Sequence, residues 1–195
     1  MSSSSALASS SIPLSDGTSH PAIAFGTYKI GYIPPSSTAS SSSVSTTKST
    51  KDILIVALST GKYSMLDCAE FYNNEADIGP AINHCLSNKI ISRPSLYIAS
   101  KVWTTTIYNG RDAVISQVET SVSDLKCEYL DLVNVHWPVP NGKHVEAYKA
   151  LEECRRRGLV KSVGVSNYAV EDYEEVSRER PTEMPTTVEE RSGKS

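Results

Sequence analysis

The chain has 195 residues, of which 39% are hydrophobic and 21% are charged, as is typical of one soluble globular domain. The formal net charge of −3 lacks the basic excess of nucleic-acid-binding proteins, so no nucleic-acid partner is expected. No apolar run approaches the roughly 18 residues that cross a membrane, so no membrane association is expected. The four scattered cysteines and a serine-rich start without signal-peptide features predict a cytoplasmic protein with reduced thiols and no metal site.

Segments of biased composition divide the chain. Residues 1–11 are serine-rich, and 12 of the 15 residues from Ser36 to Thr50 are serine or threonine. Such segments bury too little apolar surface to offset their ordering entropy. Disorder is therefore predicted for residues 1–11, for an inserted loop over 34–50 and for a polar tail over 179–195. The folded region is predicted to span residues 12–178.

Strand and helix patterns alternate within that region. Asp16-Gly17 lies between two apolar stretches, which predicts a β-hairpin. Five β-rich runs follow at 22–25, 64–67, 96–100, 130–135 and 162–165. Ala147, Ala150, Leu151 and Cys154 recur at i, i+3, i+4 and i+7, which predicts one helix face, and Val114, Val118, Val122 and Leu125 make a second helical face. A further helix is predicted to begin at Gly79-Pro80, with proline in its first position, and another over "AVEDYEEV".

The polar residues that end the last four strands recur regularly. Asp67, Lys101, His136 and Ser166 are separated by 34, 35 and 30 residues, which predicts repeated βα units in a parallel sheet. A doubly wound sheet would carry a G-x-G-x-x-G turn, and none of the ten glycines forms one. A barrel places functional residues at the carboxyl ends of its strands. The predicted fold is therefore α/β, of the (β/α)8 TIM-barrel type, here an incomplete barrel of about five parallel strands with an N-terminal hairpin.

Four side chains would meet at the mouth of such a barrel: Asp67, Tyr72, Lys101 and His136. A lysine ammonium favours the phenolate of a nearby tyrosine and lowers the pKa of that tyrosine. Asp67 would partner the buried ammonium, and His136 would orient a substrate oxygen. The set suits proton donation to a carbonyl oxygen during reduction. Taken singly, each residue also has a structural interpretation, as a loop cap, a packing residue or a buried histidine.

Several ordered motifs resemble those of the aldo-keto reductases. "LDCAEFYNNEADIG" resembles the family's D-x-A-x-x-Y-x-N-E…G signature, and "AFGTY" resembles its first-strand motif. "ASKVW", "SVSDLKCEYLDLVNVHWP" and "GLVKSVGVSNY" resemble the segments around its third, fourth and fifth strands. The resemblance covers roughly residues 12 to 176, which correspond to the first five βα units of an eight-unit family.

This resemblance implies an NADPH-dependent reductase of small aldehydes or ketones that binds NADPH/NADP without a glycine-rich loop. Tyr72 would be the general acid, and Lys101, paired with Asp67, would lower its pKa. His136 would bind the carbonyl oxygen. The implied cofactor contacts are Gly26, Thr27, Tyr28, Asp67, Ser166 and Asn167. The implied substrate contacts are Tyr28, Trp103, His136 and Trp137.

The sequence departs from the family pattern after Asn167. The family would next supply a glutamine on a sixth strand, an aromatic that stacks on nicotinamide, and a Lys/Arg cluster for the adenosine 2′-phosphate. No such residues follow, and Glu189 and Glu190 stand near the expected glutamine. The chain is therefore expected to be C-terminally truncated, without a convincing strand in its tail. Five parallel strands leave two open sheet edges, which predicts instability or self-association.

Two alternative functions remain open from the sequence. One is a catalytically inactive fragment, or a regulatory or binding subunit, with an aldo-keto reductase-like fold. The other is a different barrel enzyme, because a fold alone does not determine a function.

Overall fold

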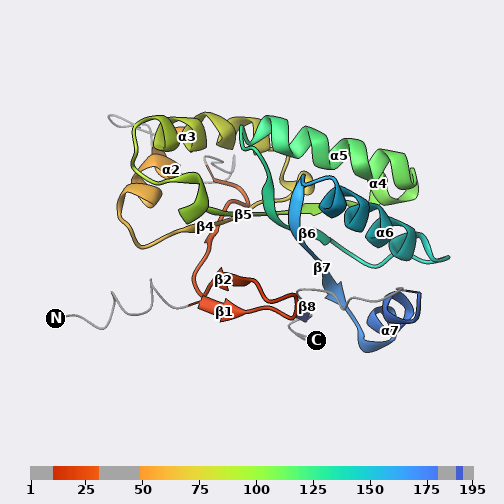
Figure 1. Ribbon diagram of the computed structural model, residues 1–195. Coiled ribbons are helices and arrows are strands. Elements are labelled where there is room, and N and C mark those ends of the chain that lie inside the picture. The colour runs from red at the N-terminus through yellow and green to blue at the C-terminus, as the bar shows by residue number, and fades with distance from the viewer. Residues whose placement is uncertain (1–10, 31–48, 180–187, 191–195) are drawn as a thin grey trace, which may run out of the picture.

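The computed structural model describes residues 11–30, 49–179 and, for the backbone, 188–190 (Figure 1). Its strands are β1 (Ser11–Pro13), β2 (Ser19–Pro21), β3 (Phe25–Gly26), β4 (Met65–Asp67), β5 (Tyr97–Val102), β6 (Leu130–Val135), β7 (Val160–Tyr168) and β8 (Val188–Glu190). Its α-helices are α2 (Thr50–Ser59), α3 (Glu75–Ser87), α4 (Thr104–Tyr108), α5 (Arg111–Asp124), α6 (Lys143–Arg156) and α7 (Val170–Arg178). Two short 3₁₀ helices are η1 (Glu70–Tyr72) and η2 (Arg93–Ser95).

The main sheet has six strands in the order β3-β4-β5-β6-β7-β8, and every neighbouring pair is parallel. Sequential strands joined by helices are the βα units of a barrel, so the predicted incomplete barrel is confirmed. The expectation of no strand in the tail is wrong at residues 188–190, because β8 pairs with β7. An open sheet edge offers unpaired N–H and C=O groups, so even a polar segment can add to it through its backbone.

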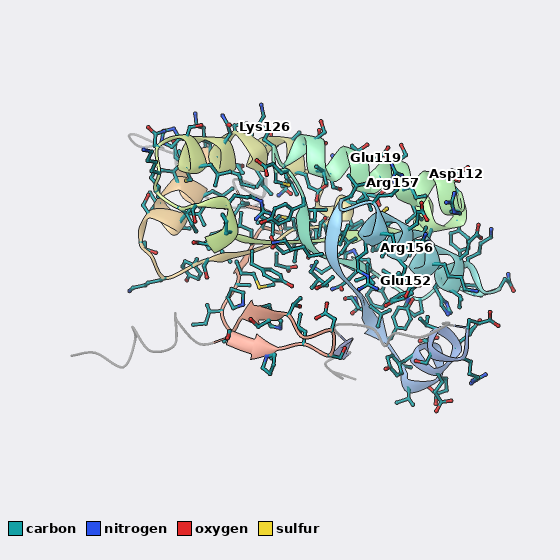
Figure 2. All side chains as sticks on the ribbon, in the orientation of Figure 1. Asp112, Glu119, Lys126, Glu152, Arg156 and Arg157 are labelled. Atoms are coloured by element: carbon teal, nitrogen blue, oxygen red, sulfur yellow. The ribbon has the colours of Figure 1, made fainter. Side chains whose placement is uncertain are left out.

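The amphipathic helices cover the sheet with the faces that their sequence predicts. On α6 the four predicted positions are all buried, and on α5 Val114 and Val118 are buried as well. The outer surfaces carry charges, and the ion pair between Arg157 and Glu119, 2.5 Å long, links the end of α6 to α5 (Figure 2). Within the described residues, no helix is both long and apolar enough to cross a membrane.

Helix α3 begins earlier than the sequence predicts. It starts at Glu75, so Pro80 lies inside the helix instead of at its first position. Glu75 and Asp77 in the first turn favour this start because acidic groups complement the positive end of the helix dipole. Gly79 has a packing reason: a Cβ there would lie 1.9 Å from the carbonyl oxygen of Asp124. The glycine therefore permits close approach to α5.

The N-terminal hairpin forms at Asp16-Gly17 as predicted, with Gly17 in the left-handed region at φ 82°. The Asp16 carboxylate accepts hydrogen bonds from the backbone N–H of Thr18 (2.9 Å) and from the hydroxyl of Ser162 (2.8 Å). Ser162 lies near the start of β7, so this contact ties the hairpin to the amino end of the sheet. Figure 1 shows the hairpin on the side of the sheet away from α3 and α5.

The predicted disorder falls mainly on residues outside the described part of the chain. Exceptions are Ser11, which begins β1, and Ser49, whose side chain accepts a hydrogen bond from the backbone N–H of Asp52 at the start of α2. The end of the predicted loop over 34–50 is therefore a helix cap. Glu179 and β8 are the described parts of the predicted tail.

Candidate functional site at the carboxyl end of the sheet

Lys101 forms the centre of the candidate site. It lies near the end of β5, and its side chain is only 4% exposed. The ammonium donates hydrogen bonds to the Asp67 carboxylate at the end of β4 and to the carbonyl oxygen of Cys68, at 3.3 Å. It also lies 3.4 Å from the phenolic oxygen of Tyr72. One buried cation thus contacts both its counter-ion and the tyrosine that the sequence singles out.

A 3₁₀ turn carries Tyr72 over the end of the sheet. After β4, the chain forms η1, in which the Tyr72 N–H donates to the carbonyl oxygen of Ala69 at 3.0 Å. Asn73 ends the turn in the left-handed region at φ 52°, a conformation that asparagine tolerates better than most residues. The turn brings the phenol back toward Lys101.

His136 follows β6 directly and completes the predicted set. Its backbone N–H donates to the carbonyl oxygen of Val102 at 3.1 Å, and its ring lies edge-on to that of Tyr72, with 6.2 Å between centroids. Burial, reinforced by the Lys101 ammonium, lowers the pKa of His136 to about 4, so the imidazole is neutral at pH 7. The Nδ1 atom is buried without a hydrogen-bond partner among the described residues.

Aromatic rings surround these polar groups. The Tyr28 ring lies 5.0 Å from the Tyr72 ring, and the Trp103 ring lies 5.0 Å from the His136 ring. Phe71 stacks on Trp103 with 4.1 Å between centroids, although 48% of Phe71 is exposed. Phe71 was not singled out from the sequence, although its place beside Tyr72 in the signature was a usable signal. Trp137, next to His136, is partly buried.

The other predicted contact residues lie at the same end of the sheet. Gly26 pairs with Asp67 across the β3–β4 ladder, and the N–H and hydroxyl of Thr27 donate to the Asp67 carbonyl oxygen at 3.1 and 2.8 Å. The Asn167 amide donates to the Ser166 hydroxyl at 3.0 Å and to the His136 carbonyl oxygen at 2.9 Å. The structure therefore brings the predicted residues of β3, β4, β5, β6 and β7 to one mouth.

Buried polar contacts beneath the mouth fix neighbouring elements. Glu75 is 5% exposed and accepts hydrogen bonds from the hydroxyls of Ser100 (2.6 Å) and Ser121 (2.7 Å). Burial raises the pKa of this carboxyl, and the two hydroxyls act against that shift. Because Ser100 precedes Lys101, the contact holds α3 against the strand that carries the lysine. Sequence reasoning did not identify this role.

Two pockets differ in their position and in the residues that line them. One of about 490 Å³ opens beside Tyr72 and is lined by Lys29, Ile30, Thr50, Tyr72, Asn73, Asn74 and Asp77. A larger one, of about 590 Å³, lies on the outer helices among charged residues of α6 and α7 and contains none of the predicted site residues. Among the residues that the structure describes, no group of three or more His, Cys, Asp or Glu is placed to hold a metal ion.

Comparisons with known proteins all point to one family. The sequence model of the aldo/keto reductase family matches residues 22–189. An aldo-keto reductase of Mycolicibacterium smegmatis is 32% identical over 161 residues, which are 82% of this chain and 50% of that protein. Aldo-keto reductase family 1 member A1 of Gallus gallus is 34% identical over 146 residues, which are 65% of this chain and 44% of that protein.

Solved structures agree with this match. The Bombyx mori aldo-keto reductase in complex with NADP has a TM-score of 0.77 and 25% identity, over 93% of this chain and 57% of that one. The aldose reductase of Schistosoma japonicum has a TM-score of 0.75 and 26% identity, over 93% of this chain and 60% of that one. The chain thus spans about half the length of the curated relatives it matches. It belongs to the aldo/keto reductase family.

Proposed function

We propose that the chain carries the carbonyl-binding and proton-donating residues of an NADPH-dependent aldehyde or ketone reductase, with Tyr72 as the general acid. One observation carries the proposal: the buried Lys101 ammonium contacts both the Asp67 carboxylate and the Tyr72 oxygen. A proton can leave a phenol more readily when a cation stabilises the phenolate, and Asp67 keeps that cation in place. The four buried, free cysteines accord with a cytoplasmic setting for this activity.

His136 has a separate role in the proposal. A neutral imidazole can donate one hydrogen bond to a carbonyl oxygen without itself releasing a proton, and the lowered pKa of His136 keeps it neutral near pH 7. Tyr72 then remains the acid. Trp103 and Phe71 offer a flat apolar surface beside these polar groups, which suits an aldehyde or ketone with an apolar or aromatic substituent.

The residues present fit the nicotinamide end of NADP. The Ser166 hydroxyl and the Asn167 amide are neutral groups that can exchange hydrogen bonds with a carboxamide, and both lie beside His136. Gly26 is exposed next to Asp67, and a Cβ there would meet nothing within 4 Å, so this edge has room for a ring. When bound, NADPH supplies the hydride that reduces the carbonyl carbon. The NADP complex of the Bombyx mori relative supports this choice of cofactor.

A catalytically inactive binding or regulatory subunit is the second candidate. The sequence favours it at one point: Glu189 and Glu190 stand near the glutamine that the family resemblance leads one to expect, and a glutamate adds negative charge where an anionic dinucleotide would bind.

The test is NADPH-dependent reduction of benzaldehyde by the purified chain and by Tyr72→Phe. We expect the substitution to lower kcat/KM by about 10²- to 10⁴-fold, the usual contribution of a general acid. Tyr108→Phe is the matched control, because Tyr108 is 53% exposed at the end of α4 and should leave the rate unchanged. Equal rates for Tyr72→Phe and the unmodified chain would refute the assigned acid. A chain that neither reduces benzaldehyde nor shows quenching of tryptophan fluorescence by NADPH would favour the second candidate.

A further inference from the structure

We propose that Glu70 is a positioning residue whose carboxylate fixes the turn that carries Tyr72 against the turn that carries Trp103, and so sets the aromatic wall of the mouth. Its kinetic consequences rest on the proposed reductase function, whereas its effect on Trp103 does not. Glu70 opens η1, and Trp103 precedes α4, so the contact joins the ends of β4 and β5.

Both carboxylate oxygens of Glu70 take part. Oε2 accepts a hydrogen bond from the backbone N–H of Trp103 at 2.6 Å, and Oε1 accepts one from the hydroxyl of Thr106 at 2.5 Å. Trp103 is the N-cap residue of α4, and its own side chain makes no capping hydrogen bond. In a capping box, a glutamate at the third helical position would bond this N–H. Thr106 holds that position here, and Glu70 supplies the acceptor from another segment.

The contact lies next to the proposed chemistry on both sides. Phe71, which follows Glu70, stacks on Trp103 with an interplanar angle of 29°. Tyr72 comes next and reaches Lys101, which stands two residues before Trp103. Among the contacts that join the two strand ends, the Asp67–Lys101 pair lies in the interior, and the contacts of Glu70 with Trp103 and Thr106 lie farther out.

Removing the outer contact should therefore let η1 shift while the inner pair holds. Small displacements of positioned groups have large kinetic costs, about 10²-fold for 1 Å. The Phe71–Trp103 stack would loosen as well, because its two rings belong to the two turns that Glu70 connects. A substrate that lies on this stack should be affected more than one too small to cover it.

Three substitutions distinguish a positioning role of Glu70 from a general contribution to the stability of the fold. Glu70→Ala removes both hydrogen bonds. Glu70→Gln can keep both, because its amide oxygen can accept from the Trp103 N–H while its NH₂ group donates to the Thr106 hydroxyl. Thr106→Val removes one bond from outside the mouth and leaves Glu70 in place.

The kinetic test compares benzaldehyde with propanal as substrates, with NADPH, for the unmodified chain and the three variants. We expect Glu70→Ala to lower kcat/KM for benzaldehyde by about 10- to 100-fold, with a smaller loss for propanal. Glu70→Gln should restore values near those of the unmodified chain, and Thr106→Val should fall between. If Glu70 acted only through stability, Glu70→Ala would lower kcat/KM for both substrates by the same factor, in proportion to the folded fraction.

The second readout does not depend on activity. Trp103 and Trp137 are the two tryptophans of the chain, so Trp137→Phe leaves Trp103 as the sole indole emitter. In this background, Glu70→Ala should shift the emission to longer wavelength, and Glu70→Gln should not. Unchanged emission in Glu70→Ala, or an equal shift in Glu70→Gln, would overturn the proposal. If Glu70→Ala does not fold, the Trp103 emission of Thr106→Val is compared with that of Thr106→Ser. Thr106→Val, which loses the hydroxyl, should shift the emission, and Thr106→Ser, which keeps it, should not. An emission shift in a chain without reductase activity would support the role of Glu70 while refuting the proposed function.

Discussion

The two ends of the parallel sheet each hold a pair of a buried cation and a carboxylate, and the two pairs have different surroundings. At the carboxyl end, Lys101 binds Asp67, whose side chain is 31% exposed, and also reaches the Tyr72 oxygen. At the amino end, Arg93 binds Asp131 at 2.9 Å, with side chains that are 10% and 9% exposed. One pair is therefore open to the mouth of the sheet, and the other is enclosed.

Both members of the enclosed Arg93–Asp131 pair make further contacts at the starts of neighbouring strands. Asp131 also accepts from the backbone N–H of Ile98 at 2.9 Å and lies 3.4 Å from the Lys161 ammonium. The Arg93 guanidinium donates to the carbonyl oxygens of Leu96 and Tyr129, both at 2.5 Å, and lies over the Tyr129 ring. These contacts join the starts of β5, β6 and β7.

The two pairs differ in what offsets the cost of burying charge. A buried ion pair costs desolvation energy, which backbone and neighbouring contacts can offset at the amino end. At the carboxyl end, the partly exposed Asp67 carboxylate and the nearby phenol leave one side of the pair open to solvent. This division agrees with the general pattern of barrels, in which one end of the sheet serves stability and the other serves function.

The largest effect is expected from breaking the enclosed pair. Asp131→Asn removes the counter-ion of Arg93 and should lower the free energy of unfolding by about 3–5 kcal/mol, measured by urea denaturation. Asp112→Asn is the control, since Asp112 pairs with Arg111 but its side chain is 93% exposed. We expect that change to cost less than about 1 kcal/mol. Similar losses in both variants would show that enclosure does not distinguish the amino-end pair.

Substitutions at two glycines test a similar contrast between a closely packed contact and the open mouth of the sheet. Gly79→Ala should lower the free energy of unfolding by about 1–3 kcal/mol, because the added methyl group would overlap the Asp124 carbonyl oxygen unless α3 and α5 separate. Gly26→Ala, at the mouth, should leave the unfolding midpoint nearly unchanged because a Cβ there meets nothing within 4 Å. Thermal denaturation followed by circular dichroism compares the two. Equal midpoints would show that the α3–α5 contact adapts without cost.

The smallest effect concerns His136 and pH. Because its pKa is lowered to about 4 in the folded chain, the unfolded chain takes up a proton between about pH 6.5 and 4 that the folded chain does not. His136 therefore contributes to a loss of stability as the pH falls through that window. The contribution is about 1 kcal/mol between pH 7 and pH 5.5. His136→Asn should remove it from urea denaturation curves, and His84→Asn should not. The same acid dependence in His136→Asn would refute the lowered pKa.

The sequence was informative wherever the position of a residue follows from strand order. Asp67, Lys101 and His136 were predictable as neighbours because parallel strands direct their carboxyl ends to one edge. Tyr72 was predictable from its motif. The helix faces of α5 and α6 were predictable because apolar spacing alone determines which side is buried.

Other features depend on contacts between distant segments, which spacing does not encode. The Glu70 carboxylate reaches Trp103, 33 residues away, through side-chain length and turn geometry. Local preference placed Pro80 at a helix start, whereas α3 begins at Glu75, whose buried carboxylate accepts hydrogen bonds from Ser100 and Ser121. Strand β8 forms through backbone pairing with an open edge, which its polar sequence does not reveal.

The roles assigned to the two ion pairs are tested by comparing Lys101→Met with Asp131→Asn, each measured for urea unfolding and for NADPH-dependent reduction of benzaldehyde at equal folded fraction. Lys101→Met should lower kcat/KM by about 10²-fold or more and cost less stability than Asp131→Asn. Asp131→Asn should lose stability and keep the rate per folded molecule. If Lys101→Met kept the rate and cost the greater stability, the open pair would be the structural one, and the assignment of the two ends would be wrong.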